Sequence, residues 1–350
     1  MHADHIIVGQ GLCGTLLSRL LVREGKSVLV IDDRDPAAAG RNAGGIINPV
    51  TGKRLVRSWM IDELLPFART TYRAIEQELR IPLLTELSIL DMYHTTDERT
   101  LFEERQQSDN EYLHTYTNDK WQQYFSYRYG IGEIAPCMLV DLRMLMDAWR
   151  VKLQNTNAVL EERFDIAALK VNEDGVSYKG ISAGSIIFCD GAACADNPYF
   201  DRLPWSKDKG EVLTVSIPGL PREHIYKQGI SIVPWRDGLF WVGASHDWKY
   251  TTLSPTPAFR KSVTDHLDNW LRLPYEVVDH IAALRPANFD RKPFIGMHPI
   301  HERIGIFNGM GGKGCSMAPY FAQHFCDHLV GHTSIMPDVD VRRYNKILSK

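Results

Sequence analysis

The stretch HIIVGQGLCGTLLSRLLVREGKSVLVID, residues 5–32, decides how the chain is expected to fold. An apolar run leads into Gly9, Gly11 and Gly14 in GxGxxG spacing, a segment of helical periodicity follows, and a second apolar run ends in Asp32. This is the order strand, tight turn, helix and strand, with an acid about 20 residues after the glycines. The stretch predicts a parallel βαβ unit that binds a dinucleotide, in preference to a glycine turn of purely structural use.

Each glycine of this turn has a physical task. Gly9 lets the chain turn, Gly11 lets the backbone approach a pyrophosphate, and Gly14 lets the helix pack closely on the strand. The unpaired N–H groups and the positive dipole end at the helix N-terminus favour an anion there. Asp32 is expected to accept hydrogen bonds from ribose hydroxyls. The flanking residues expected at the same site are Leu12 and Asp33.

Composition bounds the class of protein. The chain has 350 residues, of which 44% are hydrophobic and 24% charged, enough for a large core in about two domains. The net charge of −3 gives no general attraction to nucleic acid or to an anionic membrane, so a small-molecule partner is expected. An apolar strand begins within the first residues and no apolar run reaches a membrane-spanning length. A cytoplasmic location is predicted.

The cysteines and histidines do not suggest a metal site. The six cysteines form no CxxC pair, so reduced packing residues are expected and disulfides are not. His324 and His328 lie four residues apart on a predicted helix, a spacing that suits a metal, but no glutamate stands between them as a base. No metal is predicted.

Residues 33–59 form a segment of small residues that is expected to approach the cofactor. Gly44 and Gly45 permit close approach of a flat or phosphorylated group, and Ile46 follows them. A flexible surface loop is the alternative, although the apolar residues of the segment suit solvent poorly. An amphipathic helix is predicted for 61–79, and a second domain after it.

The rest of the chain alternates between strand and helix patterns. Strands are predicted at 87–95 and 121–130, around an Asp-Gly turn at 174–175, and at 209–215, 229–234, 238–243 and 304–307. Helices are predicted at 140–153 and 257–271, and from about Met317 onward with Ser316 as its cap. An apolar strand also runs into Asp190, Gly191 and Ala192, small residues suited to pass close to the nucleotide.

Taken together, several motifs resemble the FAD-dependent D-amino acid oxidase and glycine oxidase family over essentially the whole chain. They are GQGLCG with Asp32, AGGIINP at 43–49, CDGAA at 189–193, LRPANFDRKPFIG at 284–296, and GMGGKGCSMAP at 309–319. An unrelated dinucleotide-binding protein needs only the first, so the combination is specific.

The resemblance implies an α/β fold of two domains. A Rossmann-like FAD-binding domain comprises residues 1–80, 140–205 and 285–350, and a discontinuous second domain built on an antiparallel sheet comprises 81–139 and 206–284. Noncovalent FAD is implied, with its adenine end at Asp32 and near Phe164 and Asp165. The other cofactor residues expected on the family's pattern are Gly311, Gly312, Gly314 and Cys315.

The resemblance also implies roles for side chains in the chemistry. Arg285 of the Leu-Arg-Pro motif is expected to hold a substrate carboxylate, because a planar guanidinium grips that group bidentately. Its alternative is a salt bridge near a domain junction. Lys313 is expected to place positive charge at the flavin, with a solvated loop lysine as the alternative. His246 is expected to line the pocket with Trp248 and Tyr250. The alternative is that these side chains only pack against the protein.

Two departures from glycine oxidases leave the substrate open. Where those enzymes carry Tyr in the strand before Val-Pro, this chain has Ser231, and where they carry Arg before Asn-Gly it has Gly312 and then Lys313. One partner that orients the carboxylate is therefore missing.

The leading hypothesis is an FAD-dependent oxidation of the C–N bond of a small amine or amino acid, with oxygen or another acceptor taking the electrons. Three alternatives stand beside it. They are an oxidoreductase acting on a modified tRNA base, a non-catalytic FAD-binding protein, and an NAD-dependent dehydrogenase, since a βαβ motif alone does not identify the dinucleotide.

Overall fold

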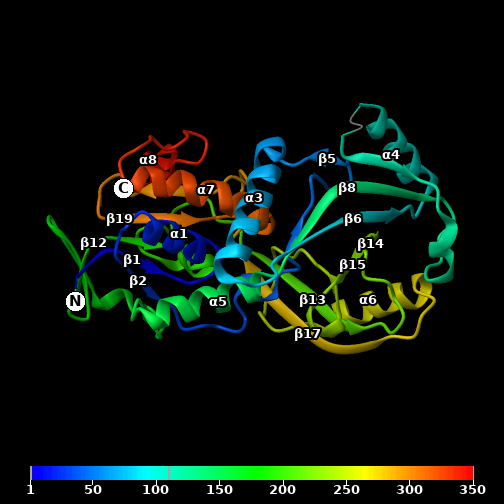
Figure 1. Cartoon of the computed structure of the whole chain (residues 1–350), viewed down its shortest axis with the longest axis horizontal. Helices are drawn as coiled ribbons and strands as arrows, with labels where there is room; N and C mark the ends of the chain where they lie inside the picture. The colour runs from blue at the N-terminus through cyan, green and yellow to red at the C-terminus, as the bar shows by residue number, and fades with distance from the viewer. Residues whose placement is uncertain (1, 109–110, 350) are drawn as a thin grey trace.

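The computed structural model describes residues 2–108 and 111–349, which build two sheets and the helices that cover them (Figure 1). The ends of the expected domain ranges at residues 1 and 350, and residues 109–110, lie outside the described part. Both described chain ends lie on the side of the first sheet, in the left half of the view.

The first sheet is centred on parallel strands. Its order is β10-β11-β12-β1-β2-β9, with β19 beside the carboxyl half of β12 and β18 beside β19. The strands are β1 His2–Val8, β2 Val28–Ile31, β9 Val159–Leu160, β10 Leu169–Asn172, β11 Gly175–Tyr178, β12 Ile181–Phe188, β18 Phe294–Met297 and β19 Ile304–Asn308. The parallel pairs β1–β2 and β1–β12 confirm the expected Rossmann-like arrangement.

Burial on both faces of the sheet explains why β1 and β2 are continuous apolar runs. Ile7, Val28 and Val30 face a core shared with α1, while Ile6 and Leu29 face a second core on the opposite side of the sheet. A parallel strand buried on both faces needs apolar residues at every position.

The second sheet is largely antiparallel. Its order is β17-β13-β16-β15-β14-β6-β8-β3, with β7 also beside β8. The strands are β3 Ile46–Ile47, β6 Leu84–Met92, β7 Leu113–Tyr116, β8 Ile131–Val140, β13 Asp208–Ser216, β14 His224–Gln228, β15 Ile230–Pro234, β16 Phe240–Gly243 and β17 Glu276–Arg285; β4 Val50–Thr51 and β5 Val56–Arg57 form a separate hairpin. β3 comes from the range expected for the first domain, and the exact domain boundaries stay a prediction.

The helices pack on these sheets as amphipathic elements. They are α1 Leu12–Arg23, α2 Ala39–Asn42, α3 Ile61–Leu79, α4 Thr96–Ser108, α5 Leu142–Asn155, α6 Pro257–Trp270, α7 Gly314–Leu329 and α8 Asn345–Leu348. Short 3₁₀ turns are η1 Asp119–Gln123, η2 Ile166–Ala168, η3 Gly191–Asp196, η4 Arg236–Gly238, η5 Gly311–Lys313 and η6 Val341–Tyr344. α7 packs against both α1 and α3, as Figure 1 shows.

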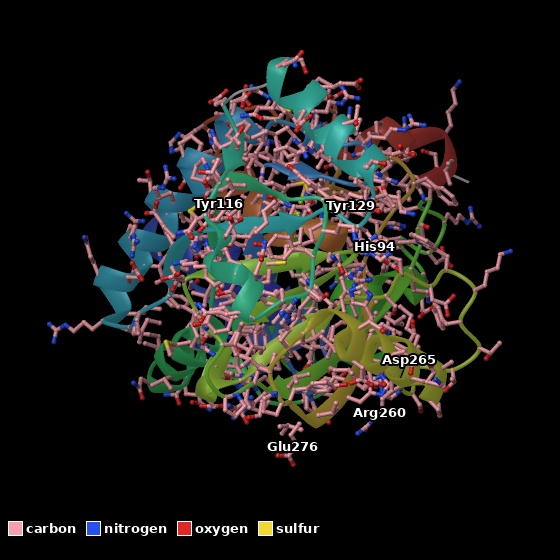
Figure 2. All side chains as sticks on the ribbon, turned by 90° about the vertical axis from the view of Figure 1, so that its right-hand side faces the viewer. His94, Tyr116, Tyr129, Arg260, Asp265 and Glu276 are labelled. Atoms are coloured by element: carbon pink, nitrogen blue, oxygen red, sulfur yellow. The ribbon has the colours of Figure 1, made fainter. Side chains whose placement is uncertain are left out.

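The far end of the second domain turns polar side chains outward. Arg260 and Asp265 of α6 and Glu276 of β17 point into solvent in Figure 2. The inner face of α6 buries Leu267 and Trp270 in the core under the second sheet. Each helix in the described residues is too short or too polar to cross a membrane.

Two predictions about elements were wrong. Residues 121–130 form no strand, because Trp121 is buried within η1 and its indole N–H donates to Tyr116 Oη at 2.7 Å, so the aromatic run is core packing. The last helix begins at Gly314, not near Met317, since η5 runs directly into it. Ser316 is therefore inside the helix, where its hydroxyl donates to Lys313 O at 3.0 Å.

Candidate active site

A cavity of about 1010 Å³ lies between the two sheets. Its wall combines the carboxyl ends of β1, β2 and β12 with the α2 segment, the second-sheet strands β13, β16 and β17, and the loop before α7. Most residues predicted for the site meet there: Gly9, Gly11, Leu12, Asp32, Asp33, Gly44, Gly45, Ile46, Phe164, Asp190, Gly191, Ala192, His246, Arg285, Gly311, Gly312, Gly314 and Cys315.

The glycine turn has the geometry that each position needs. Gly9 has φ +91°, and a Cβ there would lie 2.7 Å from Cys189 O. A Cβ at Gly14 would overlap Gly9 O, so Gly14 serves helix packing and lies outside the wall. A Cβ at Gly11 would meet no described atom within 4 Å, and no side chain caps the helix that Gly11 precedes. An anion therefore has open access to the first N–H groups of α1.

Asp32 is held by the protein at the end of β2. Its Oδ2 accepts the backbone N–H of Gln10 at 2.8 Å, and its Oδ1 accepts from Arg150 Nη1 of α5 at 2.8 Å. The side chain of Arg150 is buried, with 3% of its surface exposed. Sequence reasoning missed Arg150, because α5 is brought to β2 only by the tertiary fold.

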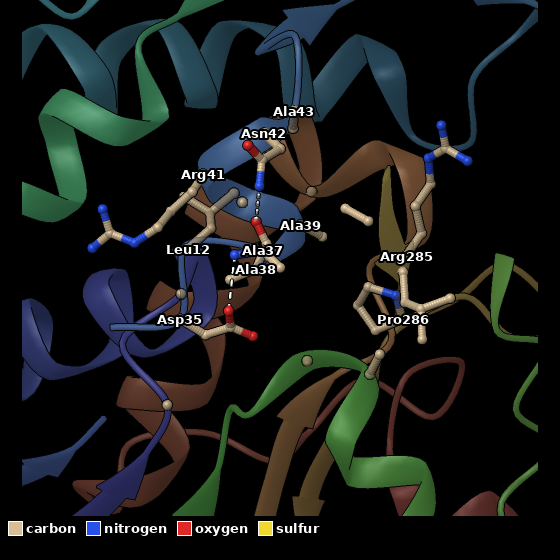
Figure 3. Close-up of a pocket in the computed structure, with 18 of the residues that line it drawn as sticks. Leu12, Asp35, Ala37, Ala38, Ala39, Arg41, Asn42, Ala43, Arg285 and Pro286 are labelled. Carbon is tan, nitrogen blue, oxygen red and sulfur yellow. Dashed lines mark hydrogen bonds between the residues drawn. The ribbon is translucent and has the colours of Figure 1, made fainter. Parts of the chain in front are cut away.

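The α2 segment is an ordered wall and not a surface loop. Asp35 Oδ1 accepts from Ala37 N at 2.8 Å, and Asn42 Nδ2 donates to Ala38 O at 3.1 Å, bonds drawn in Figure 3. Trp241 of β16 donates from Nε1 to Asn42 O at 3.0 Å. Trp241 was also missed, since its strand gave no sign of facing this segment.

Gly44 and Gly45 lie where a larger residue would not fit. A Cβ at Gly44 would touch the Trp241 ring at 3.3 Å. Gly45 has φ +71°, and a Cβ there would overlap Val140 O. These contacts let the segment lie flat on the second sheet, where Ile46 begins β3 and pairs with Leu139 of β8.

Phe164 and Asp165 were both expected at the adenine end of the cofactor, but of these two residues only Phe164 lines the cavity. Phe164 is in the wall and stacks on Tyr178, with ring centroids 4.8 Å apart. Asp165 is outside the wall, because its carboxylate caps η2 by accepting from Ala167 N at 3.0 Å. Asp165 thus lies beside the wall, and its place near the adenine stays a prediction.

Arg285 ends β17 on the side of the cavity opposite the α2 turn (Figure 3). Its Nη1 donates to Asp208 Oδ2 at 2.7 Å and to Ser245 O at 3.1 Å. Asp208 is its direct partner across β13 and β17, and a Cβ at Gly210 would overlap the guanidinium. Arg285 therefore forms the salt bridge that was the alternative to a carboxylate-binding role. It also lines the cavity, so the two roles do not exclude each other.

Asp208 links Arg285 to the cavity rim. Its Oδ2 also lies 2.6 Å from His246 Nδ1, and its Oδ1 accepts from Asp247 N at 3.0 Å. Burial opposes ionisation, but the His246 hydrogen bond and the Arg285 charge outweigh it and hold the pKa of Asp208 below its usual value. His246 is 57% exposed and stacks on Trp248, which is outside the wall, as is Tyr250.

Lys313 is a partly buried residue of the last glycine loop. Its Nζ donates to Ser58 Oγ at 3.0 Å, and the residue is outside the cavity wall. Burial lowers the pKa of Lys313 to about 8. It is therefore not a solvated loop lysine, and the expectation that it places positive charge at the flavin stays a prediction.

A buried charged network under the second sheet was not anticipated. Lys209 Nζ donates to Ser254 O at 2.6 Å and lies 3.1 Å from Glu211 Oε1. Glu211 Oε2 also accepts from Thr256 N at 2.6 Å and lies 2.9 Å from His280 Nε2. The network ties the rim segment 244–256 to β13 and β17. Charged residues inside an apolar strand were its only sequence signal.

No metal site is evident in the described residues, where no three His, Cys, Asp or Glu side chains cluster suitably. His324 Nε2 accepts from Met336 N at 2.9 Å, so its lone pair is already used. All six cysteines are unpaired thiols.

Solved structures of several proteins share the fold of this chain. Glycine oxidase from Geobacillus kaustophilus superposes with a TM-score of 0.79 at 18% identity, covering 96% of each chain. Iminodiacetate oxidase from Chelativorans sp. BNC1 gives 0.75 at 18% identity, covering 95% of this chain and 97% of that one. L-proline dehydrogenase from P. horikoshii gives 0.78 at 16% identity, covering 99% and 98%.

A curated relative is the tRNA 5-methylaminomethyl-2-thiouridine biosynthesis bifunctional protein MnmC of Caulobacter vibrioides, 24% identical over 95% of this chain. The chain spans 55% of the length of that relative.

The cavity suits a long anionic dinucleotide, because an open glycine turn and an uncapped helix end meet an acid at the end of β2. The family model described as DAO, FAD dependent oxidoreductase, matches residues 4–328. This chain therefore belongs to the DAO family of FAD-dependent oxidoreductases.

Proposed function

We propose that the protein oxidises the C–N bond of a small amine that carries a carboxylate, an amino acid in the simplest case. The observation that carries this proposal is the state of Arg285. Its Nη1 is occupied by Asp208 and Ser245, whereas Nε and Nη2 meet no acceptor among the described residues. A guanidinium edge of two parallel N–H donors, fixed in a cavity wall, suits a carboxylate.

The names of the structural relatives agree with this chemistry. Glycine, iminodiacetate and proline each carry a carboxylate on the carbon next to the amine nitrogen. When bound, FAD supplies a hydride acceptor for that carbon, the nitrogen loses a proton, and water hydrolyses the resulting imine. Arg285 orients the substrate so that the reacting C–H faces the cofactor, which contributes to the rate through positioning.

We further propose that FAD is held without a covalent bond. Three cysteines, Cys13, Cys189 and Cys315, contribute to the cavity wall. Burial raises the pKa of Cys13 and of Cys315 to about 12, and that of Cys189 well above its usual value. A covalent link needs a thiolate, and these thiols stay protonated at neutral pH.

The test is a screen of amines for bleaching of the flavin under argon. We expect α-amino acids or N-substituted glycines to bleach it and amines without a carboxylate to bleach it slowly. Bleaching by simple amines at equal rates would remove the carboxylate from the proposal. Flavin that no amine reduces would favour the non-catalytic alternative.

Arg285→Ala tests the clamp, with Arg285→Lys as the matched control that keeps the charge. Loss of a charge-assisted pair in a shielded site costs about 1.5–3 kcal/mol, so a roughly tenfold to hundredfold fall in the rate constant for reduction over KM is expected. Lysine should recover part of it. Unchanged reduction in Arg285→Ala would leave Arg285 a purely structural residue.

A modified tRNA base is the second candidate substrate, favoured by the similarity to MnmC. The net charge of −3 speaks for a small molecule instead. Bleaching by undermodified tRNA but by no free amino acid would reverse the order of the two candidates. We place the protein in the cytoplasm, with oxygen or another compound as electron acceptor.

A further inference from the structure

Two carboxyl groups flank the glycine turn, and in the described part of the chain only one of them is paired with a cation. Asp32 at the end of β2 is paired with Arg150. Asp190 follows β12 on the other side of the turn, where a Cβ at Gly9 would lie 2.8 Å from its Cα. No lysine, arginine or histidine in the described residues pairs with Asp190. The chain therefore keeps an uncompensated acid beside the place that suits a diphosphate.

The groups packed around Asp190 are all neutral. Asn308 of β19 donates from Nδ2 to Asp190 Oδ1 at 3.4 Å and to Gly191 O at 3.0 Å. The remaining titratable neighbours are thiols: Cys194 of η3 contacts the carboxyl, Cys189 directly follows β12 and precedes Asp190, and Cys13 of α1 lies near Cys189. Burial holds the pKa of each thiol far above neutrality, so none supplies charge.

The carboxyl has no structural task that requires ionisation. Asp190 precedes η3 without capping it through its side chain. The carboxyl lies in the wall of the cavity, where its only described partners, the Asn308 amide, the Cys194 thiol and its own backbone N–H, carry no charge. Burial raises the pKa of Asp190 to about 7, so the group is already half protonated near neutral pH.

We propose that Asp190 is a cofactor-binding residue in its protonated form, so that FAD binding takes up one proton from solvent. A carboxylate in a shielded wall would repel the diphosphate, which carries negative charge. The neutral acid removes the repulsion and offers an O–H donor on Oδ2, while Oδ1 keeps the Asn308 hydrogen bond. No covalent bond changes; one proton moves from solvent to the carboxyl. The inference depends only on FAD as the cofactor and not on the substrate.

The experiment measures the Kd of the full-length apoprotein for FAD from pH 5.5 to 9. For the wild type, Kd should be flat below about pH 7 and then rise toward tenfold per pH unit, because binding competes with ionisation of Asp190. Calorimetric titrations in buffers of different ionisation enthalpy should show uptake of about half a proton at pH 7 and close to one at pH 8. Asp190→Asn, which keeps the shape and a donor, should remove both effects.

Asp196→Asn is the matched control, because Asp196 also lies in the cavity wall but is 76% exposed and paired with Lys207. It should retain the wild-type pH dependence. Lys313 titrates in the same pH range. Because it is present in the wild type and in every variant, its contribution to the pH dependence of Kd cancels when they are compared. If Asp190→Asn does not fold, Asp190→Ser gives the same test of how steeply the Kd for FAD depends on pH.

An equal slope in the wild type and in the Asp190 variant would overturn the inference, as would binding of FAD without proton uptake at pH 8. A chain that binds no FAD at any pH would instead overturn the cofactor, and the two failures are therefore distinct.

Discussion

Gly11 and Gly14 carry out their roles by different contacts, which experiments can separate. A side chain at Gly11 projects into open cavity, whereas one at Gly14 meets Gly9 O within the protein. A side chain at Gly11 is therefore expected to affect ligand binding, and one at Gly14 is expected to affect folding.

We therefore expect Gly11→Val to fold normally and to lose FAD, because the backbone at Gly11 has φ −68°, which valine adopts, and the new methyl groups occupy the diphosphate space. Gly14→Val should instead lower the melting temperature of the apoprotein. Flavin content after purification and apoprotein melts check both. A yellow Gly11→Val protein would contradict the assigned role.

Lys313 poses a second question at the scale of one residue, because a buried ammonium with only a hydroxyl partner costs stability. Residues kept at such a cost often serve function. Lys313 stands in sequence between Gly312 and Gly314, which both contribute to the wall.

Lys313→Met is expected to raise the melting temperature and to lower the flavin midpoint potential, since positive charge near the flavin favours its reduced, more negative form. The difference in potential should shrink above about pH 8, where Lys313 loses its proton. Spectroscopic redox titration at pH 7 and 9 measures it. Equal potentials at pH 7 would leave the α7 N-terminus as the source of the field.

At the scale of elements, the pairing of β13 with β17 positions the proposed carboxylate clamp. The register sets Asp208 opposite Arg285, and the absence of a side chain at Gly210 leaves room for the guanidinium between the strands. The strand pair thus fixes Nη1 of Arg285, while its Nε and Nη2 meet no acceptor among the described residues.

Asp208→Asn should slow flavin reduction several-fold while carboxylate anions still perturb the flavin spectrum, because Arg285 keeps its charge but loses its orientation. The pKa of Asp208 lies below its ordinary value of 3.8, so the ion pair is complete above that pH and is lost only as the pH falls through the lower folded value. The defect should therefore be constant from pH 6 to 9.

Asp279→Asn, an exposed residue of the same strand β17, is the control and should behave as wild type. If Asp208→Asn loses carboxylate binding and reduction in equal measure, Asp208 stabilises the site in general and does not orient Arg285.

At the scale of the whole molecule, one cavity connects the two sheets, so the cofactor is expected to bridge them. FAD that binds only the folded chain adds stability by mass action, about 2.7 kcal/mol at a free concentration of 100 times Kd. Added FAD should raise the melting temperature of the wild type and leave that of Gly11→Val unchanged.

The same melt tests the noncovalent link. After denaturation, all of the flavin should pass through an ultrafiltration membrane that retains the chain. The reason is that protonated thiols in the cavity wall form no covalent bond to the flavin. Colour retained by the unfolded chain would identify a covalent bond and overturn that proposal.

The sequence by itself determined the dinucleotide unit, the amphipathic helix 61–79 and the family. These depend on short-range patterns: glycine spacing, helical periodicity, and strands buried on both faces. The βαβ unit closes within about 30 residues, so its local pattern contains nearly everything needed to predict it.

Only the tertiary structure decided how the charged groups are partnered. Arg150 reaches Asp32 and Lys313 reaches Ser58 across large separations in the chain, and Asp190 has no cationic partner among the described residues. The pKa of a side chain, and the direction in which it points, depend on neighbours from distant segments and on burial. No local pattern contains that information, which is why the sequence could name candidate site residues but could not predict their partners or protonation states.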